Sequence, residues 1–515
     1  MSSAFPYKTY RKGQKEAIKK AQQAFKKGKR FVVIEAPTGA GKSAIAVTMA
    51  REANSAYILT AQKILQEQYV NDFPDLALMK GRSNYPCLVA PTHAAAAPCI
   101  AGRKFPECDD CPYFVARDTA IAANNAIMNY AYYLAELNYS GGFQPRELLV
   151  LDEAHNSEAQ LMNFIQITIS DSALARVGIP ERVPNSSEQM GYFDFAEDIM
   201  PLLRGRSKEI DFLLKKDNLG PDAALAQMQN KNYLDNQFNR LEMLVHSRDE
   251  NFTEWVVEKG RNKEGNWIRY KPVMVDSFAR NFLFDFAENI LMLSATILNA
   301  PTFLRSLGIR PEEAEIISVE SDFPSENRPI YLRPVARLTR NYIERDLPKL
   351  VAEISEIMDA HPDDKGLIHA HSYKNTSYIA QNLPARHKKR IVTHFSGDAR
   401  DAALDKHIRS RTATVLLSPS MTEGIDLAGD LSRWQVISKI PYPFLGDPQV
   451  YRRKNLDSSW YDWRTCLTIV QAYGRSIRSR DDFAVTYILD ADFPSFLNRQ
   501  KNNLPIWFLE AISGS

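Results

Sequence analysis

The sequence predicts an α/β protein in which two parallel β-sheets are covered by helices. Three observations carry this prediction: a strand, glycine-bearing loop and helix near residue 40, an apolar strand ending in two acidic residues near residue 150, and alternating strands and helical segments after residue 328. Such alternation is typical of parallel sheets, because parallel strands need a crossover connection. With 515 residues, the chain is long enough for two to four domains.

The first element is "FVVIEAPTGAGKSAIAVTMA", which predicts a strand from Phe31 to Glu35, then a loop, then a helix beginning near Lys42. This order is typical of a phosphate-binding loop, in which backbone N–H groups converge on phosphates at a helix start. A chance Gly-Lys-Ser turn does not explain the order of the three parts. Ala36 stands where the general pattern has its first glycine. The expected nucleotide-binding residues are Thr38, Gly39, Ala40, Gly41, Lys42 and Ser43, with the Ser43 hydroxyl as a Mg²⁺ ligand.

The second element is "ELLVLDEAHN", an apolar strand followed by two acidic residues. Leu148 to Leu151 form a run that is typical of a strand buried on both faces, so Asp152 and Glu153 fall at its carboxyl end. Ligands of open α/β sheets bind at this end. We therefore expect Asp152 to hold Mg²⁺ through water and Glu153 to polarise the water that attacks the γ-phosphate. An isolated DEAH is more often a solvated strand end, and the phosphate loop argues against that alternative.

The third element, "QAYGRSIRS", places Gln471, Arg475 and Arg478 on one predicted helical turn, with both arginines on one face. Two such guanidinium groups suit the charge that develops on a transferring phosphoryl group, where an arginine finger contributes roughly 10³- to 10⁵-fold in rate. A surface helix with salt bridges is the alternative. It is disfavoured because "LLSPSMTEGIDLAGD" precedes it, an apolar strand ending in a polar loop with the candidate cleft residues Glu423, Gly424 and Asp426.

Four of the five cysteines lie between residues 87 and 111, with the spacing C-x11-C-x8-C-x2-C. No apolar segment of signal-peptide length begins the chain and no run of about 18 apolar residues occurs, so we expect a soluble, cytoplasmic protein. In a reducing compartment such clusters usually bind metal or perform redox chemistry. The spacing leaves an iron–sulfur cluster and a zinc site equally open. The four candidate ligands are Cys87, Cys99, Cys108 and Cys111.

In this order, the phosphate loop, DEAH, "LSATI" at residues 293–297, "TEGIDL" and "QAYGRSIR" resemble the motifs of superfamily 2 helicases. The cysteines between the phosphate loop and DEAH make the chain similar to the XPD/DinG family of iron–sulfur helicases. "YRKGQ" and "LTAQKILQEQY" are further matches. The resemblance implies two RecA-like parallel-sheet motor domains, with an iron–sulfur cluster insertion and a helical arch insertion in the first. It also implies that Arg11 and Gln14 lie near the adenine and that the four cysteines bind a 4Fe–4S cluster.

The activity implied by the resemblance is ATP-driven 5′ to 3′ translocation on single-stranded DNA, with unwinding of duplex at the cluster domain. The implied cofactors are ATP, Mg²⁺ and the 4Fe–4S cluster. The expected partners are single-stranded DNA and duplex junctions, for a monomeric motor without a membrane. A structural ATPase-like nucleic-acid-binding subunit, whose partner does the unwinding, is the alternative. The presence of Lys42, Asp152, Glu153, Arg475 and Arg478 argues against it, and a single P-loop kinase does not explain the second sheet.

The sequence departs from the family at two positions. Tyr130 follows Asn129 where the family often has Asn-His, which puts a DNA contact there in doubt. Asp492, after the last predicted strand, stands where many relatives carry arginine. We have no account of the second change from the sequence.

Two insertions are expected in motor domain 1. The predicted boundaries are residues 1–81, 116–157 and 281–325 for motor domain 1, 82–115 for the cluster domain, 158–280 for the arch and 326–515 for motor domain 2. The stretch between DEAH and "LSATI" is too long for a structureless loop. In it, "YLDNQFNRLEMLV" has the apolar stripe of an amphipathic helix, and "EWVVEKGRNKEGNWIRYKP" predicts two strands around a Gly-Arg-Asn-Lys-Glu-Gly turn. Motor domain 2 has predicted strands at "GLIHAHSY", "TVLLSP", "WQVISKI" and "AVTYIL".

The formal net charge is only +2. Contact with nucleic acid must therefore come from local grooves rather than from the field of the whole protein. Motor proteins hold single strands with a few basic and aromatic side chains, and each stacked base contributes about 1–3 kcal/mol. Within the cysteine segment, "AGRKFPE" offers Arg103, Lys104 and Phe105 as candidates.

Overall fold

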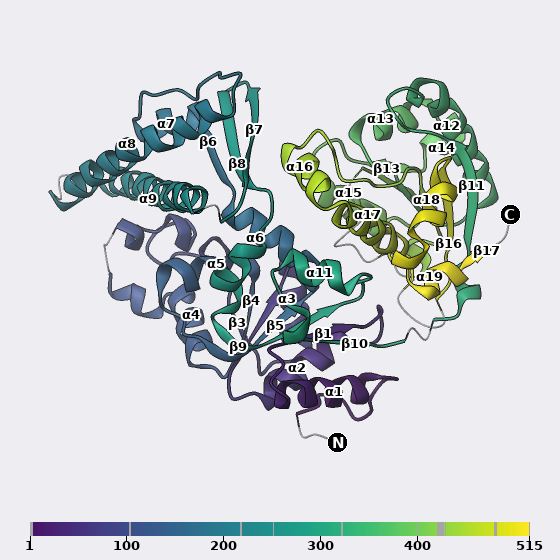
Figure 1. The fold of residues 1–515 in the computed structure, drawn as a ribbon, viewed down its shortest axis with the longest axis horizontal. Helices are drawn as coiled ribbons and strands as arrows, with labels where there is room; N and C mark the ends of the chain where they lie inside the picture. The colour runs from purple at the N-terminus through teal and green to yellow at the C-terminus, as the bar shows by residue number, and fades with distance from the viewer. Residues whose placement is uncertain are drawn as a thin grey trace.

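The computed structural model describes residues 4–513 apart from residues 102–104, 217–218, 251, 321–322, 398, 420–426, 428 and 478–481. Figure 1 shows three bodies: an N-terminal sheet with its helices, a C-terminal sheet with its helices, and a helical body with a small sheet above the first. The two large sheets are separate and parallel, as the sequence predicts.

The N-terminal sheet has seven parallel strands in the order β10-β1-β9-β5-β2-β4-β3. Its middle strands are buried on both faces, since helices cover both sides. In the register of β1 with β9, Glu35 lies opposite Ser294, and in that of β5 with β9, Asp152 lies opposite Leu293. The carboxyl ends of three strands from distant parts of the sequence therefore meet at one edge. The strands are β1 (Phe31–Glu35), β2 (Ala56–Thr60), β3 (Ala77–Leu78), β4 (Asn125–Asn129), β5 (Arg146–Asp152), β9 (Ala287–Ser294) and β10 (Ala314–Ser318).

Eight helices accompany this sheet in the described residues: α1 (Gln14–Lys26), α2 (Lys42–Glu52), α3 (Lys63–Asp72), α4 (Pro112–Ala122), α5 (Tyr130–Ala135), α6 (Ser157–Ile165), α10 (Asp276–Ala279) and α11 (Ala300–Ser306). α2 begins at Lys42, as predicted. It is buried along most of its length because it packs on the sheet, whereas α1 buries one face only.

The C-terminal sheet also has seven parallel strands, in the order β13-β14-β12-β15-β16-β11-β17. The four strands predicted there are confirmed as β12, β14, β15 and β16, and the sequence interpretation missed the other three, which lie at or near the sheet edges. The strands are β11 (Ile330–Ala336), β12 (Gly366–His369), β13 (Ile391–Thr393), β14 (Val415–Ser418), β15 (Trp434–Ile437), β16 (Val485–Asp490) and β17 (Ile512–Ser513). The helices are α12 (Ile343–Ala360), α13 (Tyr373–Asn382), α14 (Ala385–Lys388), α15 (Arg400–Arg409), α16 (Pro448–Leu456), α17 (Ser458–Tyr473), α18 (Phe493–Gln500) and α19 (Ile506–Glu510).

Between α6 and α10 the chain forms a helical body with an antiparallel sheet in the order β6-β8-β7. Its elements are β6 (Ile167–Ser170), α7 (Asp171–Val177), α8 (Met190–Lys215), α9 (Pro221–Asp249), β7 (Trp255–Asn262) and β8 (Gly265–Pro272). The predicted amphipathic helix is confirmed within α9, where Leu234 and Leu241 are fully buried. The predicted hairpin is confirmed as β7 and β8, but only residues 263–264 lie between its strands. In the described part of the chain no helix combines the length and the apolar character that a bilayer span requires.

Where the structure describes it, the cysteine segment contains four short 3₁₀ turns, η1 (Arg82–Asn84), η2 (Ala94–Ala96), η3 (Pro98–Ala101) and η4 (Pro106–Asp110). The segment leaves the sheet after β3 and returns to it through α4 and β4. Helix α9 of the helical body packs against η3. The cysteine segment therefore lies between the N-terminal sheet and the helical body.

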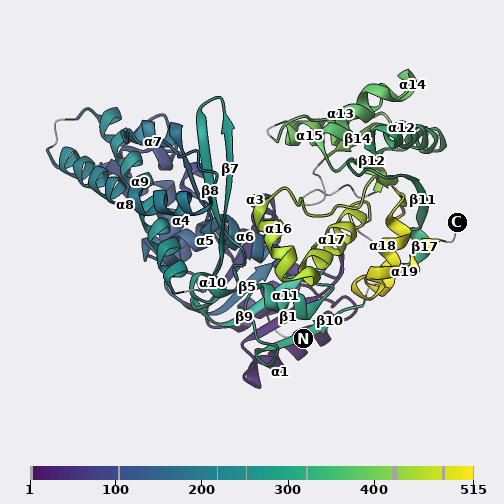
Figure 2. The ribbon, with the colours of Figure 1, turned by 45° about the horizontal axis from the view of Figure 1, so that its top comes forward.

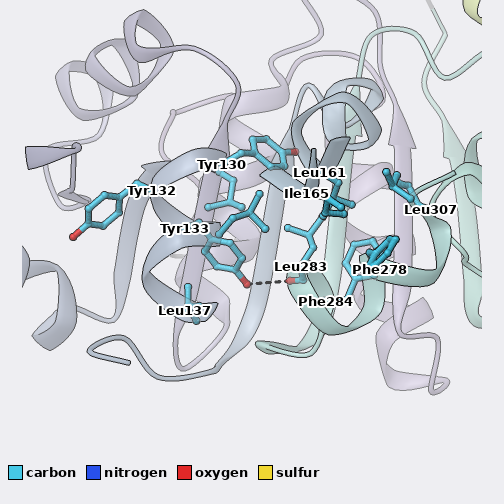
Figure 3. Close-up of a cluster of buried hydrophobic side chains, with 14 of the residues drawn as sticks. Tyr130, Tyr132, Tyr133, Leu137, Leu161, Ile165, Phe278, Leu283, Phe284 and Leu307 are labelled. Carbon is cyan, nitrogen blue, oxygen red and sulfur yellow. Dashed lines mark hydrogen bonds between the residues drawn. The ribbon is translucent and has the colours of Figure 1, made fainter. Parts of the chain in front are cut away.

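An apolar core beside α6 joins four separate parts of the chain (Figure 3). The labelled side chains come from residues 130–137, from α6, from the segment at residues 276–284 and from Leu307 after α11, and the Tyr133 hydroxyl donates to the Leu283 carbonyl at 3.2 Å. Because α6 follows the DEAH residues directly, this packing fixes where they lie. The labelled members are Tyr130, Tyr132, Tyr133, Leu137, Leu161, Ile165, Phe278, Leu283, Phe284 and Leu307.

Candidate nucleotide site and cysteine pocket

A cleft of about 810 Å³ is lined by residues of both large domains. A volume of this size is ordinary for a small-molecule or cofactor site. Ala40 belongs to the same loop but does not line the cleft, and Glu423, Gly424, Asp426 and Arg478 lie outside the described residues. The predicted site residues that line it are Arg11, Gln14, Thr38, Gly39, Gly41, Lys42, Ser43, Asp152, Glu153, Gln471 and Arg475.

The loop between β1 and α2 forms one wall of the cleft. Gly39 and Gly41 have φ values of 84° and 77°, a left-handed conformation that glycine adopts without steric cost. Gly41 is the N-cap of α2, and Lys42 and Ser43 at the start of the helix line the cleft. The unpaired N–H groups of a helix start, together with the helix dipole, favour a bound phosphate.

Arg11 and Gln14, before and at the start of α1, form hydrogen bonds with this loop. The Arg11 guanidinium donates to the Gly39 carbonyl at 2.5 Å, and the Gln14 side-chain amide donates to the Gly41 carbonyl at 3.2 Å. A Cβ atom on Gly41 would lie 2.2 Å from the Gln14 amide nitrogen, so a side chain does not fit there without displacing Gln14. Both residues thus hold the loop conformation, and their contact with an adenine stays a prediction.

Asp152 and Glu153 lie at the end of β5, across the cleft from the loop. The Tyr69 hydroxyl donates to Asp152 Oδ2 at 2.9 Å, and the Glu153 backbone N–H donates to Asp152 Oδ1 at 3.0 Å. Burial, and after it the Glu153 carboxylate, raise the pKa of Asp152 to about 6, against the opposing charge of Lys42. Glu153 and Lys42 therefore act on Asp152 in opposite directions. Carboxylate and hydroxyl oxygens are the donors that Mg²⁺ prefers, so Asp152 and Ser43 fit such an ion.

The DEAH turn itself has an unusual backbone. Glu153 has φ 50°, which is uncommon for a residue with a side chain. Such a conformation costs roughly 1–3 kcal/mol and persists where the surroundings impose it, often at functional sites. His155 helps to impose it, because its Nδ1 lies 2.8 Å from Ser294 Oγ and 3.4 Å from Glu153 Oε2. The turn thereby places Glu153 in the cleft lining.

The "LSATI" segment, which begins with the last two residues of β9, is fixed by contacts from both large domains. Glu35 Oε1 accepts from the backbone N–H groups of Ile297 and Leu298 at 2.7 and 2.9 Å. Helix α17 of the C-terminal domain provides Trp463, whose indole N–H donates to the Ile297 carbonyl at 2.7 Å. The sequence interpretation missed Glu35 and Trp463. Glu35 could have been found, because it is an acidic residue that ends the otherwise apolar first strand. The sequence holds no such signal for Trp463.

Gln471 and Arg475 reach the cleft from the C-terminal domain. The Gln471 amide lies 3.4 Å from Thr296 Oγ1, which links α17 to the "LSATI" segment. The prediction that one helical turn carries Gln471, Arg475 and Arg478 is wrong, because α17 ends at Tyr473 and Gly474 follows as its C-cap. Glycine favours a helix end over a helix interior. Arg475 is therefore placed by the loop after α17.

The four clustered cysteines line one small pocket with an apolar wall that includes Leu88 and Val89. Burial raises the pKa of the Cys99 thiol, Arg82 lowers it, and the other three thiols raise it further. In the described ranges no group of three or more His, Cys, Asp or Glu side chains is placed to hold a metal ion. Four thiols around one pocket are nevertheless a donor set that suits a soft metal or a cluster. The four ligand candidates are Cys87, Cys99, Cys108 and Cys111.

The two departures from the helicase pattern have structural partners. Tyr130 is fully buried, and its hydroxyl lies 3.0 Å from Ser157 Oγ at the start of α6. Asp492 forms a 2.7 Å ion pair with Arg337 after β11. Tyr130 thus belongs to the core rather than to the surface. Of the candidate DNA contacts in the cysteine segment, Phe105 lines the thiol pocket, and Arg103 and Lys104 lie outside the described residues.

Two family models match the chain. Residues 7–179 match the "Type III restriction enzyme, res subunit" family, and residues 354–511 match the "Helicase C-terminal domain" family. The first match covers the phosphate loop and the DEAH residues, and the second covers Gln471 and Arg475. Both walls of the cleft therefore lie in segments that match these families.

Three named relatives are each 22% identical to the chain. A probable ATP-dependent helicase of Methanocaldococcus jannaschii matches over 96% of this chain and 93% of its own length. The ATP-dependent DNA helicase YoaA of Escherichia coli matches over 95% and 92%. The ATP-dependent DNA helicase DinG of Photobacterium profundum matches over 79% and 70%.

Solved structures of similar fold include a chain titled "XPD_Helicase", with a TM-score of 0.66 at 15% identity, covering 96% of this chain and 98% of its own. Xpd4 of S. tokodaii has a TM-score of 0.59 at 15% identity, with 97% and 99% covered. At this identity the likeness concerns the fold. It extends over both large domains and the segments between their strands.

Proposed function

Because this chain belongs to the XPD/DinG-type helicases of superfamily 2, we propose that it is an ATP-driven motor that moves 5′ to 3′ along single-stranded DNA and unwinds duplex. The observation that supports this most is the composition of the cleft. A phosphate loop, an acidic pair and an arginine line one space, and they come from two domains built on separate parallel sheets. Binding and hydrolysis of a nucleotide there would change how the two domains sit together, which is how a translocating motor does work.

In this proposal each cleft residue has one task. The start of α2 and Lys42 bind the β- and γ-phosphates, and Ser43 and Asp152 hold Mg²⁺, which offsets phosphate charge. Glu153 polarises the attacking water. Arg475, joined by Arg478, contributes positive charge to the transferring phosphoryl group from the opposite domain. Closure of the two domains is therefore required for hydrolysis but not for the first contact with the nucleotide.

We further propose that the four clustered cysteines bind a 4Fe–4S cluster. Thiolate–iron bonds would fold a segment whose described residues before α4 form short 3₁₀ turns with a small apolar wall. The cluster would then serve as a structural centre of the lobe at residues 82–115. In the same proposal residues 158–280 form the arch, residues 1–81, 116–157 and 281–325 form motor domain 1, and residues 326–515 form motor domain 2.

Two substitutions test the nucleotide site. Lys42→Ala removes the charge on the phosphates, and Glu153→Gln removes the water-orienting carboxylate but keeps its shape. Each variant should lose DNA-stimulated ATP hydrolysis, while Glu153→Gln should still bind ATP because the phosphate loop is intact. Hydrolysis would be measured by phosphate release and binding by calorimetry. Wild-type turnover in either variant would show that another site hydrolyses ATP.

A further inference from the structure

Tyr69 lies in α3, and its side chain reaches the acidic edge of the nucleotide cleft. The ring packs in the apolar cluster beneath the phosphate loop, with its centroid 6.0 Å from that of Phe73. The side chain is almost fully buried, yet it lines the cleft. Its hydroxyl donates to Asp152 Oδ2 at 2.9 Å. Tyr69 is thus the donor that α3 provides to the carboxylate at the end of β5.

Each oxygen of the Asp152 carboxylate accepts one hydrogen bond. The Glu153 backbone N–H holds Oδ1 at 3.0 Å, and Tyr69 holds Oδ2. The two hydrogen bonds fix the orientation of the carboxylate plane. Each oxygen still has a lone pair that can accept a further bond. An ionised carboxylate can only accept hydrogen bonds, so the Tyr69 hydroxyl is the donor in this bond.

We propose that Tyr69 is a positioning residue for the Mg²⁺–nucleotide complex, because its hydroxyl orients the Asp152 carboxylate toward the metal. The proposal rests on the proposed ATPase function of the cleft. Residues that orient metal ligands typically change metal affinity or activity about 10- to 100-fold when they are replaced. A packing role alone would leave the metal requirement unchanged, because the ring and not the hydroxyl provides the apolar contacts.

The test is Tyr69→Phe, which deletes the hydroxyl and keeps the ring. The matched control is Tyr130→Phe, since Tyr130 is also fully buried, also lies near Asp152 and Glu153, and bonds Ser157 instead of Asp152. For each protein, ADP affinity is measured by calorimetry over a series of Mg²⁺ concentrations and in EDTA. Thermal unfolding without nucleotide shows whether the fold is retained.

We expect Tyr69→Phe to raise the Mg²⁺ concentration for half-maximal tightening of ADP binding about 10- to 100-fold. Its affinity for ADP in EDTA should equal that of the wild type, and Tyr130→Phe should show no shift in the Mg²⁺ requirement. An unshifted requirement in Tyr69→Phe, or an equal shift in both variants, overturns the proposal. If the wild type shows no Mg²⁺-dependent ADP binding, the ATPase function fails together with it.

Discussion

At the scale of residues, the chemistry of the cleft depends on the charged side chains of Asp152, Glu153 and Lys42, which lie close together there. Asp152 is almost fully buried beside Glu153, and burial, followed by the Glu153 carboxylate, raises its pKa to about 6. Lys42, at the start of α2, lowers the pKa of Asp152 through its opposite charge. A cation bound beside these carboxylates would act on Asp152 in the same direction as Lys42.

The residues of this site differ in how far the sequence predicts them. Lys42, Asp152 and Glu153 were predictable because each belongs to a short local motif in which strand, loop and charge follow one another. Tyr69 and Trp463 were not, because their partners are 83 and 166 positions away in the chain. Such contacts follow from strand order and domain packing, which no local pattern encodes. The same limit applies to Arg11 and Gln14, whose bonds to the phosphate loop span 28 and 27 positions.

Arg475→Ala should lower the turnover of ATP more than the affinity for it. Arg475 enters the cleft from the loop after α17, whereas the phosphate loop belongs to the other domain, so its contribution comes when the domains close. We expect a loss of about 10³-fold or more in kcat, as for other arginine fingers. Turnover and nucleotide affinity would be measured on the same preparation.

The matched control for this variant is Arg409→Ala in α15, which removes an exposed arginine of the same domain. It should hydrolyse ATP normally. Loss of ATP binding by Arg475→Ala, with normal hydrolysis of the ATP that still binds, would exclude the finger role.

At the scale of elements, the β7–β8 hairpin forms a contact between the helical body and the C-terminal domain (Figure 2). Lys271 on β8 forms ion pairs of 2.6 Å with Asp447, just before α16, and of 2.9 Å with Glu258 on β7. The Gln449 amide donates to the Val273 carbonyl at 2.7 Å. The hairpin is thus attached to α16 as well as to its own domain.

Lys271→Met should loosen this contact, because it leaves Asp447 and Glu258 without the cation that they share. A hydrogen bond to a charged group contributes about 1.5–3 kcal/mol, so amide exchange in β7, β8 and α16 should accelerate accordingly. Hydrogen exchange followed by mass spectrometry measures this. Arg261→Met, which removes an exposed arginine from the same hairpin, is the control, and equal acceleration in both variants would show that the Lys271 contact does not hold the hairpin.

Cys108→Ser should remove iron and lower the unwinding of 5′-tailed duplex far more than it lowers ATP hydrolysis on single strands. The cysteine pocket is lined by none of the residues of the nucleotide cleft, so the proposed cluster has no direct part in hydrolysis. Iron content, visible absorbance, hydrolysis and unwinding would be measured together, with thermal unfolding as a check on the fold.

Cys466→Ala is the control, because Cys466 is buried in α17 and lies outside the thiol pocket. It should retain its iron. An iron-free Cys108→Ser protein that unwinds at the wild-type rate would exclude a role of the lobe in strand separation.

Elements with strong local patterns were predicted well, and their ends less well. The apolar stripe of α9 and the alternation of the hairpin identified these elements, but the hairpin strands extend to within two residues of each other because each end continues the ladder. Helix α17 was expected to continue through Arg478 and stops at Tyr473, where glycine follows. Short edge strands such as β13 and β17 carry too few residues for a pattern to appear.

At the scale of the whole molecule, two parallel sheets share one nucleotide cleft, and a third body stands above the first sheet (Figure 1). Helix α17 reaches from the second domain to the "LSATI" segment through Trp463 and Gln471. If the cleft opens or closes on hydrolysis, α17 would move with the "LSATI" segment, and α16 and the attached β7–β8 hairpin would move with α17. These contacts connect the nucleotide cleft to the helical body through the C-terminal domain.

The measurement that tests the central claim most directly is displacement of a labelled strand from duplexes with a 5′ tail, with a 3′ tail and with blunt ends. The account predicts that the wild-type protein, given ATP and Mg²⁺, displaces the strand from the 5′-tailed duplex and leaves the others paired. Glu153→Gln should displace none of them while still binding ATP. A wild-type protein that hydrolyses ATP on single-stranded DNA but separates none of the duplexes, or only the 3′-tailed one, would contradict the account.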